Sequence, residues 1–456
     1  MPGGDPASVI TRAIQLVSLL ALVGWPVAGA QPNTLAITGT TVIDVATGGL
    51  RQNTTVVIRG SVIAAVGERL QIPAGSTVVD GRGKFLIPGL WDMHAHHEGT
   101  GEASLPLFVA NGVTGTRDMG SALDFILPLR QRVSSGQVLG PAIVAAGPIL
   151  DDAPAGWPFR LRVRTAQEAR EAVQMLKQRG VDFIKVHDHT PRDAYFAIAD
   201  EAKRQGLPFA GHVPAGVTMA EAVEAGQRSI EHLANFRVFT ECSRGRDYQP
   251  SQCISLFEQF AKRGVWQTPT LAFMRKLLTI NTSPADAEAD HVAYASPGLK
   301  KVWAENQRES SASPERIRTF LALADASLPA VRDMHRAGVG ILAGCDGLVP
   351  GFCLADELTT MVRAGLSPLE ALQTATINPA RYFGKERSAG SVEPTKIADL
   401  VLLDANPVED IANIRRINAV IVRGKLLRRS ELDTMLKKAR DAFRPPTPRD
   451  AGGRPR

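Results

Sequence analysis

The sequence lacks several features that would define its class at once. It has only four cysteines among 456 residues, Cys242, Cys253, Cys345 and Cys353, and none lies in a Cys-x-x-Cys pair. In an oxidising compartment a Cys242–Cys253 disulfide would close a short loop and add about 3 kcal/mol of stability; two free thiols are the alternative. After residue 30 no run is apolar for long enough to cross a bilayer, which excludes a membrane span there.

Net charge is also scarce outside the C-terminal end. The formal charge is +6, but from Arg428 onward nine Lys/Arg against four Asp/Glu supply +5 of it. We therefore interpret residues 431–456 as a basic tail whose proline-rich end frays in solvent. The nearly neutral main body gives no indication of a nucleic-acid partner.

Residues 1–30 are predicted to be a secretory signal peptide. The run "AIQLVSLLALVGWPVA" is short and apolar, and Ala28 and Ala30 supply the small residues expected before a cleavage point. The alternative, a membrane anchor, is disfavoured because roughly sixteen residues are few for a span and Gln15, Ser18 and Pro26 interrupt them. The mature protein would be periplasmic or secreted and would not contact the membrane.

Two β-rich stretches flank a middle part of different character. Residues 31–88 and 386–430 contain short runs such as "NTTVVIRGSVIAAVG" and "IADLVLLDANP", with the alternation and glycine punctuation of antiparallel strands. We predict that they form one small β-sandwich domain built from both termini. The length and the 44% apolar content suffice for this domain and one larger domain.

The middle, residues 89–385, alternates apolar strand-like runs with amphipathic helical stretches. The eight candidate strands are "GLWDMHAH", "GVTGTRDM", "PAIVAAG", "VDFIKVH", "LPFAGHV", "QRSIEHL", "GVWQTPTLAF" and "GVGILAGCD". Strands that alternate with helices in this way predict an α/β fold, a closed parallel (β/α)8 TIM barrel with its active site at the C-terminal strand ends. Residues 272–337 exceed an ordinary crossover and read as a helical insertion, a lid or side subdomain.

Ligand-type side chains recur at the ends of these strands. In "WDMHAHHEG" the alternation of a strand sends His94 and His96 to one face and His97 to the other. Four other strands end in Lys185, His212, His232 and Asp346. Imidazole and carboxylate groups that converge on one barrel mouth form a natural site for Zn²⁺ or a similar divalent cation.

Lys185 is the most informative of these residues. It lies inside the apolar run "VDFIKVH", where an unpaired ammonium would carry a large desolvation cost and would repel a metal ion. Both difficulties disappear if CO₂ carboxylates the amine to an anionic carbamate that bridges two metal ions. The alternative is a salt bridge to a buried acid such as Asp182 or Asp188.

Over essentially everything after the signal, the chain resembles the amidohydrolase superfamily. The motifs "HAH", "IKV", "GHV", "SIEHL" and "AGCDG" match its strand ends, and "GKFLIPGLWDMHAH", "SPLEALQTATINPARYFG" and "GSVEPTKIADLVLLDANP" resemble its imidazolonepropionase-like and prolidase-like branch. The resemblance implies two divalent metal ions, zinc being the favoured identity. The implied ligands are His94, His96 and Asp346 for the more buried ion, His212 and His232 for the second, and carboxylated Lys185 as the bridge.

The same resemblance implies the chemistry of a two-metal hydrolase. The shared water becomes a hydroxide near neutral pH and attacks a carbonyl that the metal ions polarise. Asp346 is then the catalytic residue, a general base that accepts the proton of the water and returns it to the leaving nitrogen.

Further residues are candidates for contact with the substrate. His187 shares strand parity with Lys185, a loop histidine in solvent being the alternative. Arg117 ends the second strand and Tyr195 opens the helix after the fourth; either could hold a carboxylate or carbonyl of the substrate, with structural pairing as the alternative. Asp118, in "RDMG", is expected to support the loop beneath the metal ions. Cys345 should face the barrel wall, free or bonded to Cys353.

We therefore expect an exported, binuclear metal-dependent hydrolase that cleaves a C–N amide bond in a small molecule such as a dipeptide or an N-acyl amino acid. The alternatives are cyclic-amide hydrolysis or deamination, attack on a lactone, ester or phosphotriester, and a non-catalytic metal-binding protein. The sequence leaves open the substrate, the native metal, the pairing of the cysteines and the oligomeric state, for which a homo-oligomer is one option.

Overall fold

The computed structural model describes residues 34–153, 159–244, 247–276, 279–280, 291–310 and 313–444. The predicted signal peptide and the last residues of the predicted basic tail lie outside the described residues. Residues 431–442 of that predicted tail belong instead to a helix, α17 (Arg429–Ala442), in which Leu432 and Ala439 are buried. Within the described residues, this amphipathic helix packs its apolar side against the core.

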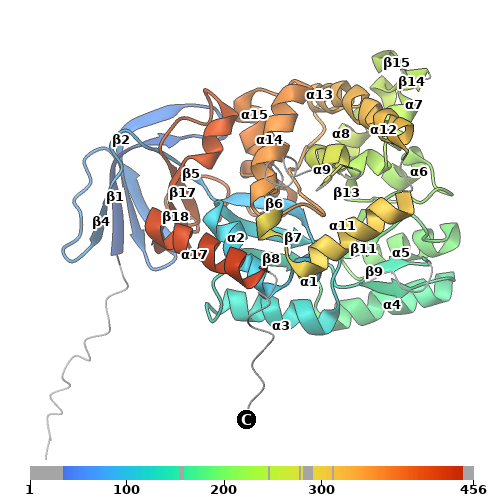
Figure 1. Ribbon diagram of the computed structural model, residues 1–456, viewed down its shortest axis with the longest axis horizontal. Coiled ribbons are helices and arrows are strands. Elements are labelled where there is room, and N and C mark those ends of the chain that lie inside the picture. The colour runs from blue at the N-terminus through green and yellow to red at the C-terminus, as the bar shows by residue number, and fades with distance from the viewer. Residues whose placement is uncertain are drawn as a thin grey trace, which may run out of the picture. The chain divides into compact units, whose positions relative to one another are not determined.

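Both ends of the described chain contribute to one eight-stranded sheet, in the order β19-β18-β17-β5-β1-β2-β3 with β4 on β1. Its strands are β1 (Thr34–Ile43), β2 (Leu50–Arg59), β3 (Val62–Gly67), β4 (Thr77–Asp80), β5 (Phe85–Pro88), β17 (Leu400–Leu403), β18 (Ile417–Val422) and β19 (Lys425–Arg428). The antiparallel pair β5 and β17 joins the two halves, and Figure 1 shows the late strands beside the early ones. The union of both ends is as expected, whereas a sandwich of two facing sheets is not confirmed.

The middle of the chain contributes parallel strands in two sheets, β6-β7-β8 and β10-β9-β11-β12-β13-β16. Their bounds are β6 (Leu90–Ala95), β7 (Val113–Asp118), β8 (Ala142–Ala145), β9 (Ile149–Asp151), β10 (Arg160–Arg162), β11 (Ile184–Val186), β12 (Phe209–Gly211), β13 (Ser229–Glu231) and β16 (Trp266–Thr268). Seven of the eight predicted barrel strands are present, and the structure adds the short strands β9 and β10, which the sequence did not predict.

Backbone hydrogen bonds connect the edges of the two parallel sheets. The eighth predicted strand is reduced to a bridge between Ile341 and Gln267 of β16, and the amide of Met93 in β6 donates to the carbonyl of Ala343. At the other edge, the amide of Asp182 donates to the carbonyl of Ala145 in β8. The parallel strands therefore point their C-terminal ends to one side, where the predicted ligands lie.

Helices follow most of the parallel strands, as Figure 1 shows. The α-helices are α1 (His97–Thr100), α2 (Leu105–Ala110), α3 (Leu123–Ser134), α4 (Ala166–Arg179), α5 (Arg192–Arg204), α6 (Met219–Glu224), α7 (Arg237–Glu241), α8 (Ile254–Arg263), α9 (Leu271–Lys276), α11 (Pro297–Ser310), α12 (Pro314–Ala326), α13 (Leu328–Arg336), α14 (Phe352–Ala364), α15 (Pro368–Thr374), α16 (Ile377–Tyr382) and α17. Their ends follow local chemistry: Thr165 caps α4 by accepting the amide of Glu168, and Gly180 ends it in the left-handed conformation that glycine adopts at little cost.

Shorter elements complete the described chain. They are the strands β14 (Ser243–Arg244) and β15 (Asp247–Tyr248) and the 3₁₀ helices η1 (Glu102–Ser104), η2 (His232–Ala234), η3 (Pro250–Gln252), η4 (Val292–Tyr294) and η5 (Ile411–Arg415). The predicted insertion, residues 272–337, contains most of α9 together with η4, α11, α12 and α13, in agreement with its helical pattern. Within the described residues, no helix combines the length and the apolar content needed to span a membrane.

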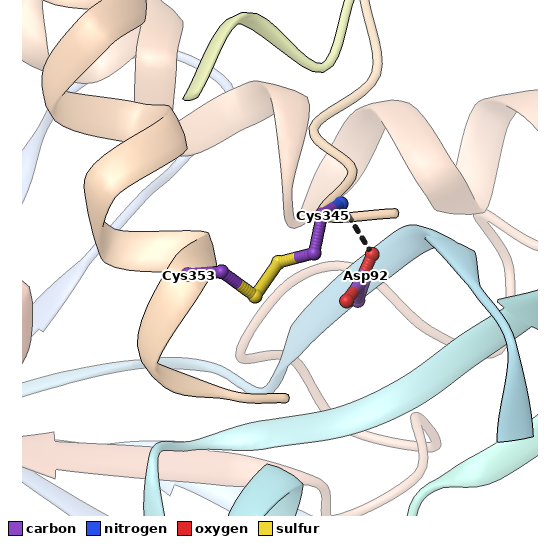
Figure 2. A group of neighbouring side chains, drawn as sticks. All are labelled: Asp92, Cys345 and Cys353. Carbon is purple, nitrogen blue, oxygen red and sulfur yellow. Dashed lines mark hydrogen bonds between the residues drawn. A yellow bond between two sulfur atoms is a disulfide. The ribbon is translucent and has the colours of Figure 1, made fainter. Parts of the chain in front are cut away.

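All four cysteines form disulfides, Cys242 with Cys253 and Cys345 with Cys353. The first pair closes the short loop that the sequence suggested. The second settles the open alternatives for Cys345, whose sulfur is bonded to that of Cys353 in α14 (Figure 2).

Candidate metal centre

The six predicted ligands lie at the C-terminal ends of parallel strands or just beyond them. His94 is in β6 and His96 follows it, Lys185 is in β11, His212 follows β12, His232 follows β13, and Asp346 follows the segment paired with β16. All are buried or half-buried, and all six line one cavity of about 430 Å³. The structure thus brings together every residue that the sequence proposed as a ligand.

Asp346 is at the centre of this group. Its Oδ1 lies 3.4 Å from Nε2 of His96 and 3.9 Å from Nε2 of His94, and its Oδ2 lies 3.4 Å from Nε2 of His232. The ring of His212 lies 4.9 Å from that of His232, centroid to centroid. Nitrogen and oxygen donors at such separations can share a divalent cation after small adjustments.

The opposite nitrogen of each histidine faces a polar group of the protein. Nδ1 of His94 lies 2.9 Å from Oε2 of Glu231, and Nδ1 of His96 lies 3.2 Å from the carbonyl of Gly120. Because a carboxylate and a carbonyl only accept, these contacts place the proton on Nδ1 and leave the lone pair on Nε2. This is how metal-binding histidines are usually oriented.

Nδ1 of His232 and Nδ1 of His212 also face polar groups of the protein. Nδ1 of His232 lies 2.6 Å from the hydroxyl of Thr270, and Nδ1 of His212 lies 2.9 Å from Oδ1 of Asp188. Thr270 sits at the start of α9 with a positive φ of 45°, and Glu357 of α14 accepts the amides of the next two residues at 3.0 and 2.7 Å. The start of α9 is therefore fixed where Thr270 can orient the imidazole.

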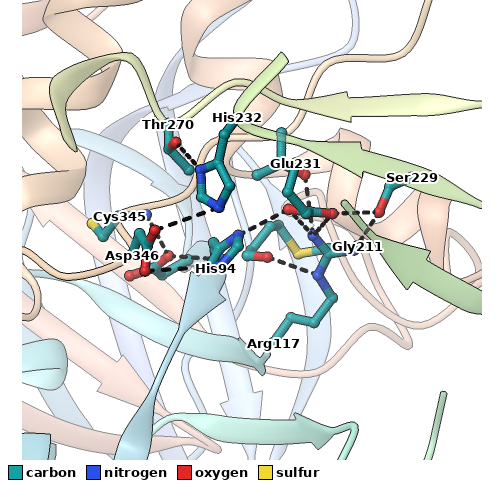
Figure 3. Close-up of polar contacts among 12 residues, drawn as sticks. His94, Arg117, Gly211, Ser229, Glu231, His232, Thr270, Cys345 and Asp346 are labelled. Carbon is teal, nitrogen blue, oxygen red and sulfur yellow. Dashed lines mark hydrogen bonds and ion pairs between the residues drawn. The ribbon is translucent and has the colours of Figure 1, made fainter. Parts of the chain in front are cut away.

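A buried ion pair lies beneath His94 (Figure 3). The guanidinium of Arg117 donates to both carboxylate oxygens of Glu231 at 2.9 Å, and neither side chain is exposed to solvent. Arg117 also donates to the carbonyl of Met93, while the hydroxyl of Ser229 donates to Glu231 at 2.7 Å. Both carboxylate oxygens of Glu231 thus accept two contacts each, and the carboxylate holds His94 in one orientation.

Two further aspartates tie the strand ends together. Asp92 accepts the amides of His94 and Cys345, at 3.1 and 3.0 Å, and so links β6 to the segment that carries Asp346 (Figure 2). Burial raises the pKa of Asp92 to about 7 against these two hydrogen bonds. Asp118 accepts the amides of His97 and Gly120, at 2.8 and 3.3 Å, which supports the loop beneath the site as the sequence suggested.

Lys185 is fully buried, and the alternative partners that the sequence offered do not pair with it. Asp182 is bound to Arg130 at 2.6 Å, and Asp188 faces His212 and Asn235. Burial lowers the pKa of Lys185 to about 8, although the carboxylates of Glu231 and Asp346 work in the opposite direction. A large fraction of the amine is therefore neutral near pH 8, which is the form that reacts with CO₂.

The absence of a side chain at Gly211 leaves room for Lys185 where β12 packs closely against β11. Gly211 of β12 has a φ of 133°, and a Cβ at this position would lie 2.1 Å from the carbonyl oxygen of Val186 and 3.0 Å from Cδ of Lys185. Only glycine fits there without displacing the lysine.

The protonation of the other groups also suits metal binding. Burial lowers the pKa of His94, His212 and His232, and the charge of Lys185 lowers each further, so these imidazoles are neutral at pH 7. Burial opposes ionisation of Asp346, but its hydrogen bond with His96 and the nearby His232 outweigh this and lower its pKa to about 2. The site therefore combines three neutral imidazoles with a charged carboxylate, whereas contact with that carboxylate outweighs burial and raises the pKa of His96.

Of the three predicted substrate contacts, the structure places only His187 in the cavity wall. Its ring stacks on that of His212 with centroids 3.9 Å apart. Arg117 and Tyr195 need correction, because both are fully buried and bonded inside the protein: Arg117 to Glu231, and Tyr195 to Gln227, whose Oε1 accepts the phenol hydroxyl at 2.6 Å. Structural pairing, the alternative stated for both, describes them.

Glu231 and Thr270 contribute to the site without having been singled out from the sequence, and Asp188 was named there only as a possible partner of Lys185. A usable signal existed for Glu231: in "SIEH" Ser229 and Glu231 share one face of a buried parallel strand, and two polar side chains there must pair inside the barrel. Thr270 and Asp188 lie in turns whose direction depends on tertiary packing, so their sequence context gave no such signal.

Comparisons with known proteins agree with this architecture. The Amidohydrolase family matches residues 85–427. The chain is 26% identical over 436 residues to the ochratoxinase of Aspergillus niger, covering 81% of each protein, and 25% identical over 380 residues to an imidazolonepropionase of Acinetobacter baumannii, covering 79% of this chain and 90% of that one. A solved structure of a prolidase-like protein from Bifidobacterium longum superposes with a TM-score of 0.70 at 26% identity, covering 90% of this chain and 99% of that chain.

The chain belongs to the amidohydrolase family, in its imidazolonepropionase-like and prolidase-like branch. Its fold is the α/β TIM-barrel type of that family, and it is a hydrolase that acts on carbon–nitrogen bonds. Members of this superfamily generally bind divalent metal ions and act on small molecules. The cluster of histidines around Asp346 is where such an ion would bind.

Proposed function

We propose that the protein is an exported, binuclear metal-dependent amidohydrolase that cleaves the C–N amide bond of a small substrate such as a dipeptide or an N-acyl amino acid. The observation that carries this proposal is the orientation of three imidazoles. His94, His96 and His232 each direct Nε2 toward Asp346 while Nδ1 faces a polar group of the protein. Such an arrangement is costly to assemble without a cation to share.

The donor set fits two divalent ions. His94, His96 and Asp346 would hold one, and His212 and His232 the other. Imidazoles and a carboxylate favour zinc among the common metal ions. Deep burial of Lys185 without a bonded acid among the described residues supports its role as the bridging ligand.

As a carbamate, Lys185 would contribute two oxygens to the site. The neutral amine attacks CO₂, a C–N bond forms, and the amine loses a proton, so that the product carries one negative charge. This change replaces a buried cation, which repels metal ions, by an anion that attracts them. The lowered pKa of Lys185 makes the reactive neutral amine available.

The protein groups then divide the work of hydrolysis. When bound, divalent metal ions acidify water and polarise the scissile carbonyl. Asp346, ionised and within reach of three imidazoles, accepts the proton of the attacking water and delivers it to the leaving nitrogen. Glu231 holds the imidazole of His94 in its orientation during hydrolysis, and Thr270 does the same for His232.

Hydrolysis of a cyclic amide is the second candidate function. It is favoured by the similarity to an imidazolonepropionase, whereas the similarity to an ochratoxinase and to a prolidase-like structure favours a linear amide. A screen of dipeptides, N-acyl amino acids and cyclic amides with the zinc-loaded protein separates the two. Turnover of linear amides is expected, and turnover of cyclic amides alone would replace the first proposal by the second.

Export is supported by the leader sequence and by the disulfides. The structure pairs all four cysteines, and such bonds persist in oxidising compartments. N-terminal sequencing of protein produced with the full leader should give a mature chain that starts at Gln31. A mature chain that starts at Met1 would rule out cleavage.

A further inference from the structure

The cavity beside the predicted ligands has walls of two chemical kinds. The polar part consists of the six predicted ligands, His187 and Asn235. The remaining lining residues are apolar: Ile149, Phe236, Phe273, Met274 and Phe320. We refer to Phe236, Met274 and Phe320 as the apolar wall.

The apolar wall is preformed by packing among its members. Phe236 and Met274 belong to one buried cluster, on which Phe273 and Phe320 pack. The rings of Phe236 and Phe320 meet edge to face with centroids 5.4 Å apart. Phe320 comes from α12, within the predicted insertion, so a segment outside the ordinary strand and helix alternation supplies part of the cavity.

An unusual backbone segment connects the apolar wall to the proposed metal ligands. Five consecutive residues other than glycine, 232 to 236, have positive φ values between 49° and 68°. This left-handed conformation is unfavourable for such residues and is retained where a site requires it. The segment begins at His232 and ends at Phe236, so a single turn delivers both a predicted ligand and an aromatic ring to the same cavity.

The cavity therefore offers an apolar surface immediately next to the reacting groups. An apolar substituent gains by leaving water for this surface, whereas a charged one would lose its hydration without a matching partner there. Lys185 is the only lysine or arginine among the described lining residues, and it is assigned to the metal centre.

We propose that the apolar wall selects substrates with a bulky apolar group, preferentially an aromatic ring, next to the scissile amide. This inference rests on the proposed amide hydrolysis at the adjacent site. Phe236, Met274 and Phe320 are then specificity-determining residues. Small or acidic side chains at the same substrate position leave the wall unfilled or bury a charge against it.

A binding measurement tests the wall independently of turnover. The zinc-loaded protein is titrated calorimetrically with 3-phenylpropanohydroxamic acid and with acetohydroxamic acid, which share a metal-binding head and differ in the aromatic group. Wild type should bind the phenyl compound about tenfold more tightly or better. Phe320→Ala and Met274→Ala should each reduce this preference to less than about threefold.

Leu321→Ala is the matched control, because Leu321 is the neighbour of Phe320 on α12 but lines a separate surface groove. It should keep the wild-type preference. Equal binding of both hydroxamates by wild type, or an unchanged preference in both wall variants, would overturn the proposal.

Turnover separates this proposal from the proposed function. The pairs Gly-Phe with Gly-Ala and N-acetyl-Phe with N-acetyl-Ala are compared by kcat/KM in wild type and Phe320→Ala. Cleavage without an aromatic preference would leave amide hydrolysis standing and reject the wall. A binding preference without cleavage of any amide would leave the wall standing and reject amide hydrolysis.

Discussion

Replacing Glu231 by Gln should weaken both the fold and the metal centre. Glu231 is not exposed to solvent, and its oxygens receive both contacts from Arg117 at 2.9 Å, the hydroxyl of Ser229 at 2.7 Å and Nδ1 of His94 at 2.9 Å. An amide keeps the shape but removes the charge, so the buried guanidinium loses its counter-ion. Breaking one side of a buried pair costs about 3–5 kcal/mol, a large share of the stability of an ordinary domain.

The same substitution turns one of the two acceptor oxygens of Glu231 into an NH₂ donor and so weakens the group that orients His94. Loss of such a partner behind a ligand lowers metal affinity by about 10 to 100-fold. Urea unfolding of the metal-free protein measures the first effect, and competition with a chelator of known zinc affinity measures the second. Both effects should appear together in Glu231→Gln.

Glu201→Gln is the matched control. Glu201 on α5 is similarly buried and accepts from Gln174 and Gln205 at 3.1 and 2.8 Å. Its charged partners Arg204 and Arg170 both reach solvent and both also pair with Asp200, so the change does not strand them. It should keep wild-type zinc affinity. The reasoning fails if Glu231→Gln costs less than about 1 kcal/mol, or if both variants lose zinc affinity equally.

Three further predictions follow from the structure. Asp346→Asn should retain much of the metal but lower kcat by about 10²- to 10⁴-fold; metal analysis with initial rates checks this, and undiminished turnover would remove the proposed base. Burial raises the pKa of Asp399 to about 6, despite the amide of Arg423 that it accepts at 2.6 Å. The folded state therefore binds this proton more tightly than the unfolded state, stability falls as pH rises from about 4 to 6, and Asp399→Asn should recover up to about 3 kcal/mol at pH 7 but little at pH 4 in urea unfolding. The double variant Cys242→Ser/Cys253→Ser should lose about 3 kcal/mol, and an unchanged unfolding midpoint would show that this disulfide does not form.

The candidate site could be predicted from the sequence because the positions of its residues follow a simple geometric rule. Parallel strands end on one side, and alternation along each strand selects the inward positions, so His94, His96 and Lys185 could be placed at one rim without coordinates. The predicted domain boundaries remain predictions. The positions of seven predicted strands agree with the structure, whereas the eighth is reduced to a bridge at Ile341 and β9 and β10 were not predicted.

What the sequence could not supply was the identity of partners distant along the chain. Arg117 and Tyr195 carry polar groups that could bind a substrate. Only the tertiary structure shows that Arg117 pairs with Glu231 and that Tyr195 donates to Gln227. The left-handed turn that ends at Phe236 was equally hidden, because no glycine marks it. Local patterns report which residues are buried, whereas long-range packing decides what each buried polar group meets.

The central claim, a two-metal centre bridged by carboxylated Lys185, is tested most directly by metal analysis. The protein is produced in medium that contains zinc, exposed to bicarbonate and purified. Plasma mass spectrometry should then give about two ions per chain for wild type and one or fewer for Lys185→Met. A wild-type content of one ion per chain, unchanged in Lys185→Met, would contradict it.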